Sequence, residues 1–122
     1  MADTYDNTVK QAMAETKKAT TDGKGKISTF EEFIALKKKA IFITKHMIEK
    51  IKETPDDSPV YTRMGRSYLV VSKDDEVKRL ENTIVQMNAD IKMLESHKFK
   101  IELDIAAKQD NMRQMIASMK KK

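Results

Sequence analysis

Hydrophobic residues recur in alternating steps of three and four along the C-terminal half of the chain. Between Val77 and Met119 these steps meet thirteen positions, eleven of them apolar, and no proline or glycine interrupts the segment. A seven-residue repeat sustained in this way is typical of a helix whose apolar seam faces another helix. We predict such a helix over about residues 74–120. Its seam positions are Val77, Leu80, Ile84, Met87, Ile91, Leu94, Lys98, Ile101, Ile105, Lys108, Met112, Met115 and Met119.

A second, weaker seam leads up to Pro55. Proline disfavours helical geometry at the residue before it, so this helix is expected over about residues 5–54. Gly23 and Gly25 weaken it around residues 20–28, but the phase of the seam continues across them, which favours an unbroken helix. Its seam positions are Val9, Met13, Thr16, Thr20, Gly23, Ile27, Phe30, Ile34, Lys37, Ile41, Thr44, Ile48 and Ile51.

The two seams fit one antiparallel register. In this register Ile51 faces Val77 and Val9 faces Met119. Each seam residue between them in the first helix likewise faces one seam residue of the second. Two unrelated helices would rarely agree over thirteen rungs, so the chain is expected to fold back on itself.

A short β-hairpin is predicted between the helices, over about residues 59–72. The segment is rich in β-branched and aromatic residues, has Gly65 near its middle, and follows the turn-forming run 55–58. Ser72 and Asp75 provide a capping-box start for the second helix. The fold class is therefore mainly α: a long antiparallel two-helix coiled coil with one hairpin at the connecting end, forming a single domain over residues 1–122.

The hairpin is expected to assemble with other chains, because an isolated two-stranded ribbon is marginally stable and leaves its edges open. The residues predicted to form this oligomerisation surface are Val60, Tyr61, Met64, Tyr68, Leu69, Val70 and Val71. A further apolar stripe follows a different face of the first helix. It is either a broadened core or, as we favour, a contact with a neighbouring subunit. Its residues are Phe33, Leu36, Ala40, Ile43 and Met47.

Composition excludes several classes of function. The net charge is +5, but most lysines alternate with acidic residues and no aromatic residues lie among them to stack on bases, so we expect no nucleic-acid partner. No apolar run is long enough to span a membrane, and no cysteine is present. We expect a soluble, cytoplasmic protein that does not act at a membrane.

No catalytic, cofactor or metal site is predicted. His46 and His97 are far apart and lack the partners of a metal site. Residues 20–31 resemble a calcium-binding EF-hand loop, but Thr20 stands where a carboxylate ligand is expected, and Lys24 puts a cation where an oxygen ligand should be. We therefore expect a protein that is not an enzyme.

The hairpin resembles that of β-type prefoldin subunits, the co-chaperones of group II chaperonins, and most of all a β-type subunit of the eukaryotic complex. The resemblance rests on the run 55–57, Tyr61, Gly65 and the β-forming run to Val71, between two long heptad helices. It implies a hexamer of two α-type and four β-type subunits, whose hairpins form a β-barrel. It also implies that the coil tips hold unfolded actin, tubulin and other nascent clients without nucleotide and pass them to the chaperonin.

The free end of the coil suits that task because it is rich in methionine, whose flexible side chain adapts to many apolar segments. The weak seam positions Thr16, Thr20 and Lys108 would let this end open. Alternatively, the methionines close the coil, or the chain is a structural tether without chaperone activity. The predicted client-binding residues are Val9, Met13, Ile105, Met112, Met115, Ile116 and Met119.

Overall fold

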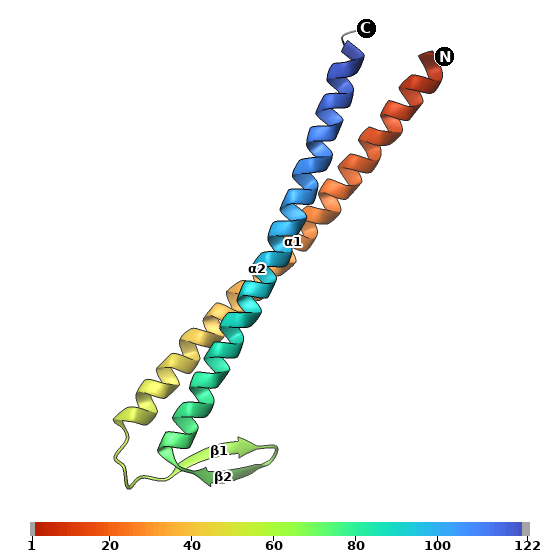
Figure 1. The fold of residues 1–122 in the computed structure, drawn as a ribbon. Coiled ribbons are helices and arrows are strands. Elements are labelled where there is room, and N and C mark those ends of the chain that lie inside the picture. The colour runs from red at the N-terminus through yellow and green to blue at the C-terminus, as the bar shows by residue number, and fades with distance from the viewer. Residues whose placement is uncertain (1, 121–122) are drawn as a thin grey trace. The chain divides into compact units, whose positions relative to one another are not determined.

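The computed structural model describes residues 2–120, and the side chains of residues 7–119. The chain forms helix α1 (Ala2–Glu53), strand β1 (Val60–Met64), strand β2 (Ser67–Val71) and helix α2 (Lys73–Lys120), in that order (Figure 1). The predicted fold class, two long helices joined by one hairpin, is confirmed. No helix among the described residues is both long and apolar enough to cross a membrane.

Contacts divide the chain into two compact units. Unit 1 combines the part of α1 up to Glu32 with the part of α2 from Leu94, and unit 2 is residues 33–93. Helix α1 is continuous through Gly23 and Gly25, so the segment that resembles a calcium loop is helical.

The core of unit 2 lies on the predicted seam. Ile34, Ile41 and Ile48 of α1 are each 8% exposed, and three residues of α2 are buried with them: Leu80, Met87 and Ile91. Burying side chains of this size contributes about 1.5–3 kcal/mol each. Thr44 is also buried on the seam, and its hydroxyl donates a hydrogen bond of 2.8 Å to the Ala40 carbonyl.

In unit 1 the two helices pack in the predicted antiparallel register. Gly23 lies against Ile105, and the Thr16 hydroxyl donates a 3.8 Å hydrogen bond to the Met112 sulfur. Next to these pairs, Phe30 stacks on His97 with ring centroids 6.1 Å apart. The neighbouring Lys98 forms a 3.2 Å ion pair with Glu31.

The predicted seam was wrong at three positions of unit 1: Met13, Lys108 and Met115 are all exposed. The half-buried residues nearby are instead Ala12, Gln109 and Ile116. Beyond Ile105 the inward-facing residues of α2 follow a step of four where the heptad pattern predicts three. The next step is one of three, to Met112, so the steps of three and four are taken in the opposite order while the seven-residue period from Ile105 through Met112 to Met119 is kept.

The hairpin is antiparallel and closes through Gly65 and Arg66. Its strands pair Val60 with Val71 at the base and Met64 with Ser67 at the turn. Gly65 has φ 62°, a left-handed conformation that glycine adopts without strain, and this is the geometry of a tight hairpin turn.

Polar contacts join the start of α2 to the end of α1 and to the segment that follows α1. Ser72 caps α2 as predicted, its hydroxyl accepting a 3.1 Å hydrogen bond from the Asp75 amide. Lys73 reaches back to the end of α1, where its ammonium donates to the carbonyls of Lys52 at 3.0 Å and Thr54 at 2.8 Å. It also forms an ion pair with Asp56 at 3.3 Å.

Candidate functional site

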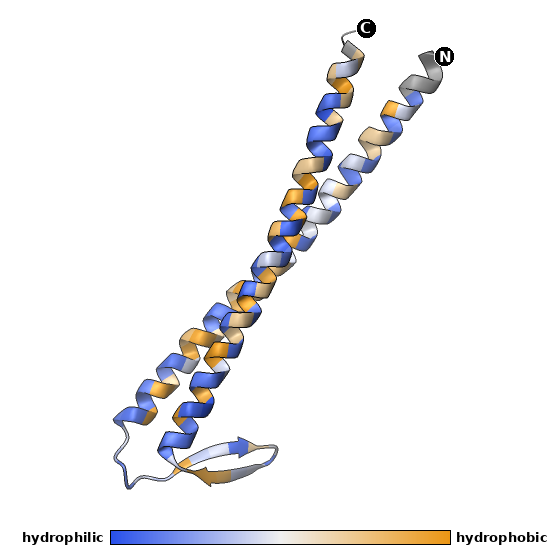
Figure 2. Ribbon diagram, viewed as in Figure 1, coloured by the Kyte–Doolittle hydropathy of each residue, from blue (hydrophilic) through white to orange (hydrophobic). Residues whose placement is uncertain are grey.

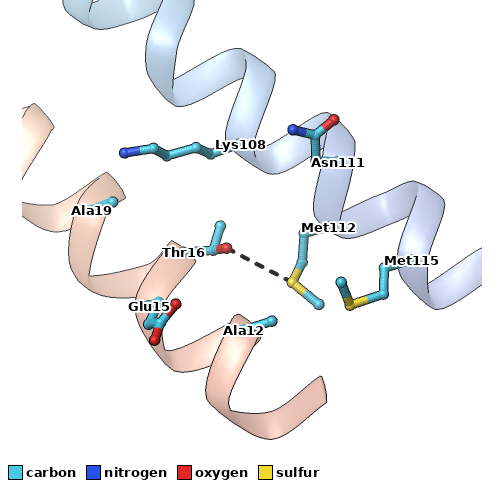
Figure 3. Close-up of a pocket in the computed structure, with 8 residues that line it drawn as sticks. All are labelled: Ala12, Glu15, Thr16, Ala19, Lys108, Asn111, Met112 and Met115. Carbon is cyan, nitrogen blue, oxygen red and sulfur yellow. Dashed lines mark hydrogen bonds between the residues drawn. The ribbon is translucent and has the colours of Figure 1, made fainter. Parts of the chain in front are cut away.

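A groove of about 310 Å³ lies between α1 and α2 in unit 1 (Figure 3). Helix α1 contributes short side chains at three successive inward positions, Ala12, Thr16 and Ala19, with Glu15 beside them. Helix α2 contributes longer ones: Lys108, Asn111, Met112 and Met115. Because small residues on one helix face long, flexible ones on the other, the side chains leave open space between the helices.

A second groove, of about 360 Å³, shares two lining residues with the first. The shared residues are Thr16 and Met112, which contact each other and so form a common wall. The second groove carries Met13, as the first carries Met115. Its other lining residues are Lys17, Thr20, Thr21, Lys24 and Gln109. Each groove therefore combines an exposed methionine with a half-buried one and has charged residues at its rim.

The seven predicted client-binding residues differ in accessibility. Met13 is 47% exposed and Met115 38%, so both are open to solvent beside the grooves. Ile105 is buried against Gly23. The remaining four are half-buried: Val9, Met112, Ile116 and Met119.

The alanines that make the grooves are absent from the predicted site. The heptad steps select Met13 and not Ala12, and they pass over Ala19. The signal that could have found them is the spacing of small residues at positions 12, 16 and 19, which puts all three on one face of α1.

The hairpin in unit 2 is the second candidate site. Its register places the pairs Tyr61–Val70 and Arg63–Tyr68 on one face, and all four residues are exposed. On the other face, Val60 and Val71 at the base are half-buried, while Leu69 and Met64 are exposed. Strand β2 is largely hydrophobic (Figure 2). Because the two strands pair only with each other among the described residues, both outer edges carry free backbone groups.

A buried charge lies at the base of the hairpin. Glu76 is 5% exposed, and its carboxylate accepts two hydrogen bonds from Arg79, one of them 3.1 Å long. These hydrogen bonds raise the pKa of the Arg79 guanidinium. The positive charge of Arg79 thus compensates the negative charge of the buried Glu76 carboxylate, which lies in the first turn of α2.

Comparisons with known proteins place the chain in context. A family model described as prefoldin subunit matches residues 11–119. No curated protein matches the sequence. The fold is similar to the crystal structure of the prefoldin beta subunit from Thermococcus strain KS-1, with a TM-score of 0.70 and 16% sequence identity. That similarity covers 88% of this chain and 90% of the other.

Proposed function

Because the chain belongs to the prefoldin subunit family and has the fold of a β-type subunit, we propose that it is part of an ATP-independent holdase. In this proposal it joins other α-type and β-type prefoldin subunits in a cytoplasmic hexamer. It captures unfolded actin, tubulin and other nascent clients and delivers them to the group II chaperonin. It needs neither nucleotide nor catalysis.

The observation that carries the proposal is the pair of methionine-bearing grooves in unit 1. An unfolded client exposes short apolar segments of varied shape, and methionine adapts to such segments because its unbranched side chain is flexible and polarizable. Met13 and Met115 are accessible as they stand, whereas Ile105 reaches a client only when the helices part. The proposed client-binding residues remain Val9, Met13, Ile105, Met112, Met115, Ile116 and Met119.

The hairpin is the proposed assembly surface. Its exposed apolar face and open edges are both satisfied if hairpins of neighbouring subunits join in a β-barrel. The proposed oligomerisation residues are Val60, Tyr61, Met64, Tyr68, Leu69, Val70 and Val71. Within the family, Tyr61, the pair 65–66 and the pair 72–73 are most similar to subunit 1 of the eukaryotic complex, and we assign the chain to that type.

A client-aggregation assay tests the holdase function. Denatured actin is diluted into buffer containing the reconstituted assembly, and light scattering reports its aggregation. The double variant Met13→Ser/Met115→Ser should need at least about tenfold more assembly for the same suppression, because it removes both exposed groove methionines. Met93→Ser is the matched control: Met93 is a 57% exposed methionine outside both grooves, so this variant should act like the wild type.

Two results would count against the proposal. If the wild-type assembly does not suppress aggregation, the chain is a structural tether. If the double variant suppresses as well as the wild type does, clients bind elsewhere. Circular dichroism of each variant separates loss of binding from loss of helix.

A further inference from the structure

The apolar stripe on the outer face of α1 is not part of the core. Four of its five residues, Phe33, Leu36, Ile43 and Met47, are between 45% and 63% exposed, and Ala40 is half-buried. The seam residues beside them in sequence, such as Ile34 and Ile48, are 8% exposed. The stripe is therefore a separate face and not a broadened core. Its spacing of three and four residues spans roughly 21 Å of helix, which is long enough to match several turns of a second helix.

The segment that carries the stripe also carries the net charge of the protein. Residues 33–52 contain six lysines and one glutamate, a formal charge of +5, so acidic and basic residues balance over the rest of the chain. Lys37 is paired with Asp90 at 3.3 Å and Lys50 with Glu53 at 3.8 Å. The other four make no ion pair with a described residue: Lys38, Lys39, Lys45 and Lys52.

Two of the lysines border the stripe. Lys39 follows Leu36 by three residues and precedes Ile43 by four, and Lys50 follows Met47 by three, so each lies beside an apolar residue on the helix surface. The surface thus combines a narrow apolar ridge with a cationic rim along one helix.

We propose that this face of α1 binds an acidic amphipathic helix of a different polypeptide. The partner's apolar side chains pack on Phe33, Leu36, Ile43 and Met47, while its carboxylates pair with the lysine rim. A second copy of this chain does not fit as well, because a symmetric contact through this face would bring two segments of charge +5 together. A lipid surface fits less well too, since the apolar stripe has the narrow spacing of a coiled-coil contact and not the wide face of a membrane-bound helix.

Binding of a designed peptide to the full-length chain tests the inference. The probe is a fluorescent helical peptide of about four turns with leucine in steps of three and four and glutamate at the flanking positions. The control peptide carries lysine in place of each glutamate. The acidic peptide should bind at least about tenfold more tightly than the basic one, and its affinity should fall in about 1 M NaCl, where charges are screened beyond ~3 Å.

Variants locate the binding site. The double variant Leu36→Ser/Ile43→Ser should weaken binding of the acidic peptide at least about tenfold. The control Val85→Ser/Leu103→Ser, which alters exposed residues of α2, should leave the affinity for the peptide unchanged. Circular dichroism confirms that both variants remain helical. The inference fails if the two peptides bind equally or if the stripe variant keeps full affinity. It also fails if the stripe variant instead abolishes self-association or binding to phosphatidylserine vesicles.

Discussion

At the scale of single residues, Gly23 shows how a poor helix former can suit its position. A Cβ atom at this position would lie 2.6 Å from Ile105 Cδ1 and 3.0 Å from Ile105 Cγ1. The missing side chain therefore lets a bulky isoleucine pack against the backbone of α1. From the sequence alone, only the low helix propensity of glycine could be predicted. The favourable packing depends on Ile105, which is more than eighty positions away.

Gly23→Ala and Gly25→Ala should have different effects on stability. Alanine at Gly25, which has no atom within 4 Å of a built Cβ, should raise the free energy of unfolding by about 1 kcal/mol. Alanine at Gly23 should lose that gain, because the Cβ forces Ile105 to move, and overpacking costs about 1–3 kcal/mol. Urea unfolding followed by circular dichroism at one protein concentration measures both values. Equal stabilisation by the two substitutions would show that Ile105 does not pack closely on Gly23.

At the scale of elements, the features that could be predicted are those that a local or repeating sequence pattern defines. The two helices, their antiparallel register and the Ser72 cap all follow from local spacing. The predicted inward positions near Met13 and Met115 were wrong because the seven-residue period does not fix whether a step of three or a step of four comes first. For the same reason the small residues that form the grooves were missed.

Lys73 is another feature that no local pattern shows. The first residue of α2 satisfies two carbonyls at the end of α1, which otherwise lack intrahelical partners, and it also pairs with Asp56. Its three ammonium hydrogens thus have three acceptors, so the lysine joins both helices to the segment that leads into the hairpin.

Lys73→Met should destabilise this junction. Methionine keeps most of the chain length but cannot donate hydrogen bonds, so the free energy of unfolding should fall by about 2 kcal/mol. Amide hydrogen exchange should accelerate from Thr54 to Ser58. Lys78→Met is the control, because Lys78 is exposed and makes no hydrogen bond or ion pair with the described residues. If both variants unfold at the same urea concentration, Lys73 does not hold the junction.

At the scale of the whole molecule, the two units carry different unsatisfied surfaces. Unit 1 has open grooves, which suit brief contact with many partners, and unit 2 has a ribbon with exposed side chains and free edges, which suits permanent pairing. The sequence predicted the ribbon and its need for partners, because a hairpin of this composition cannot be stable alone. The identity of the neighbouring subunits depends on side chains of other proteins, so this sequence alone could not supply it.

The central claim, that the hairpin completes its fold by joining other subunits, is tested most directly by native mass spectrometry. The chain is mixed with α-type prefoldin subunits, and the mass of the complex is measured for the wild type, Tyr68→Lys/Val70→Lys and the control Val85→Lys, whose site is an exposed position of α2. The account predicts hexamers for the wild type and the control. It predicts none for the hairpin variant, because two lysines would be desolvated in the barrel. Hexamers of the hairpin variant in equal yield, or no hexamers of the wild type, would contradict it.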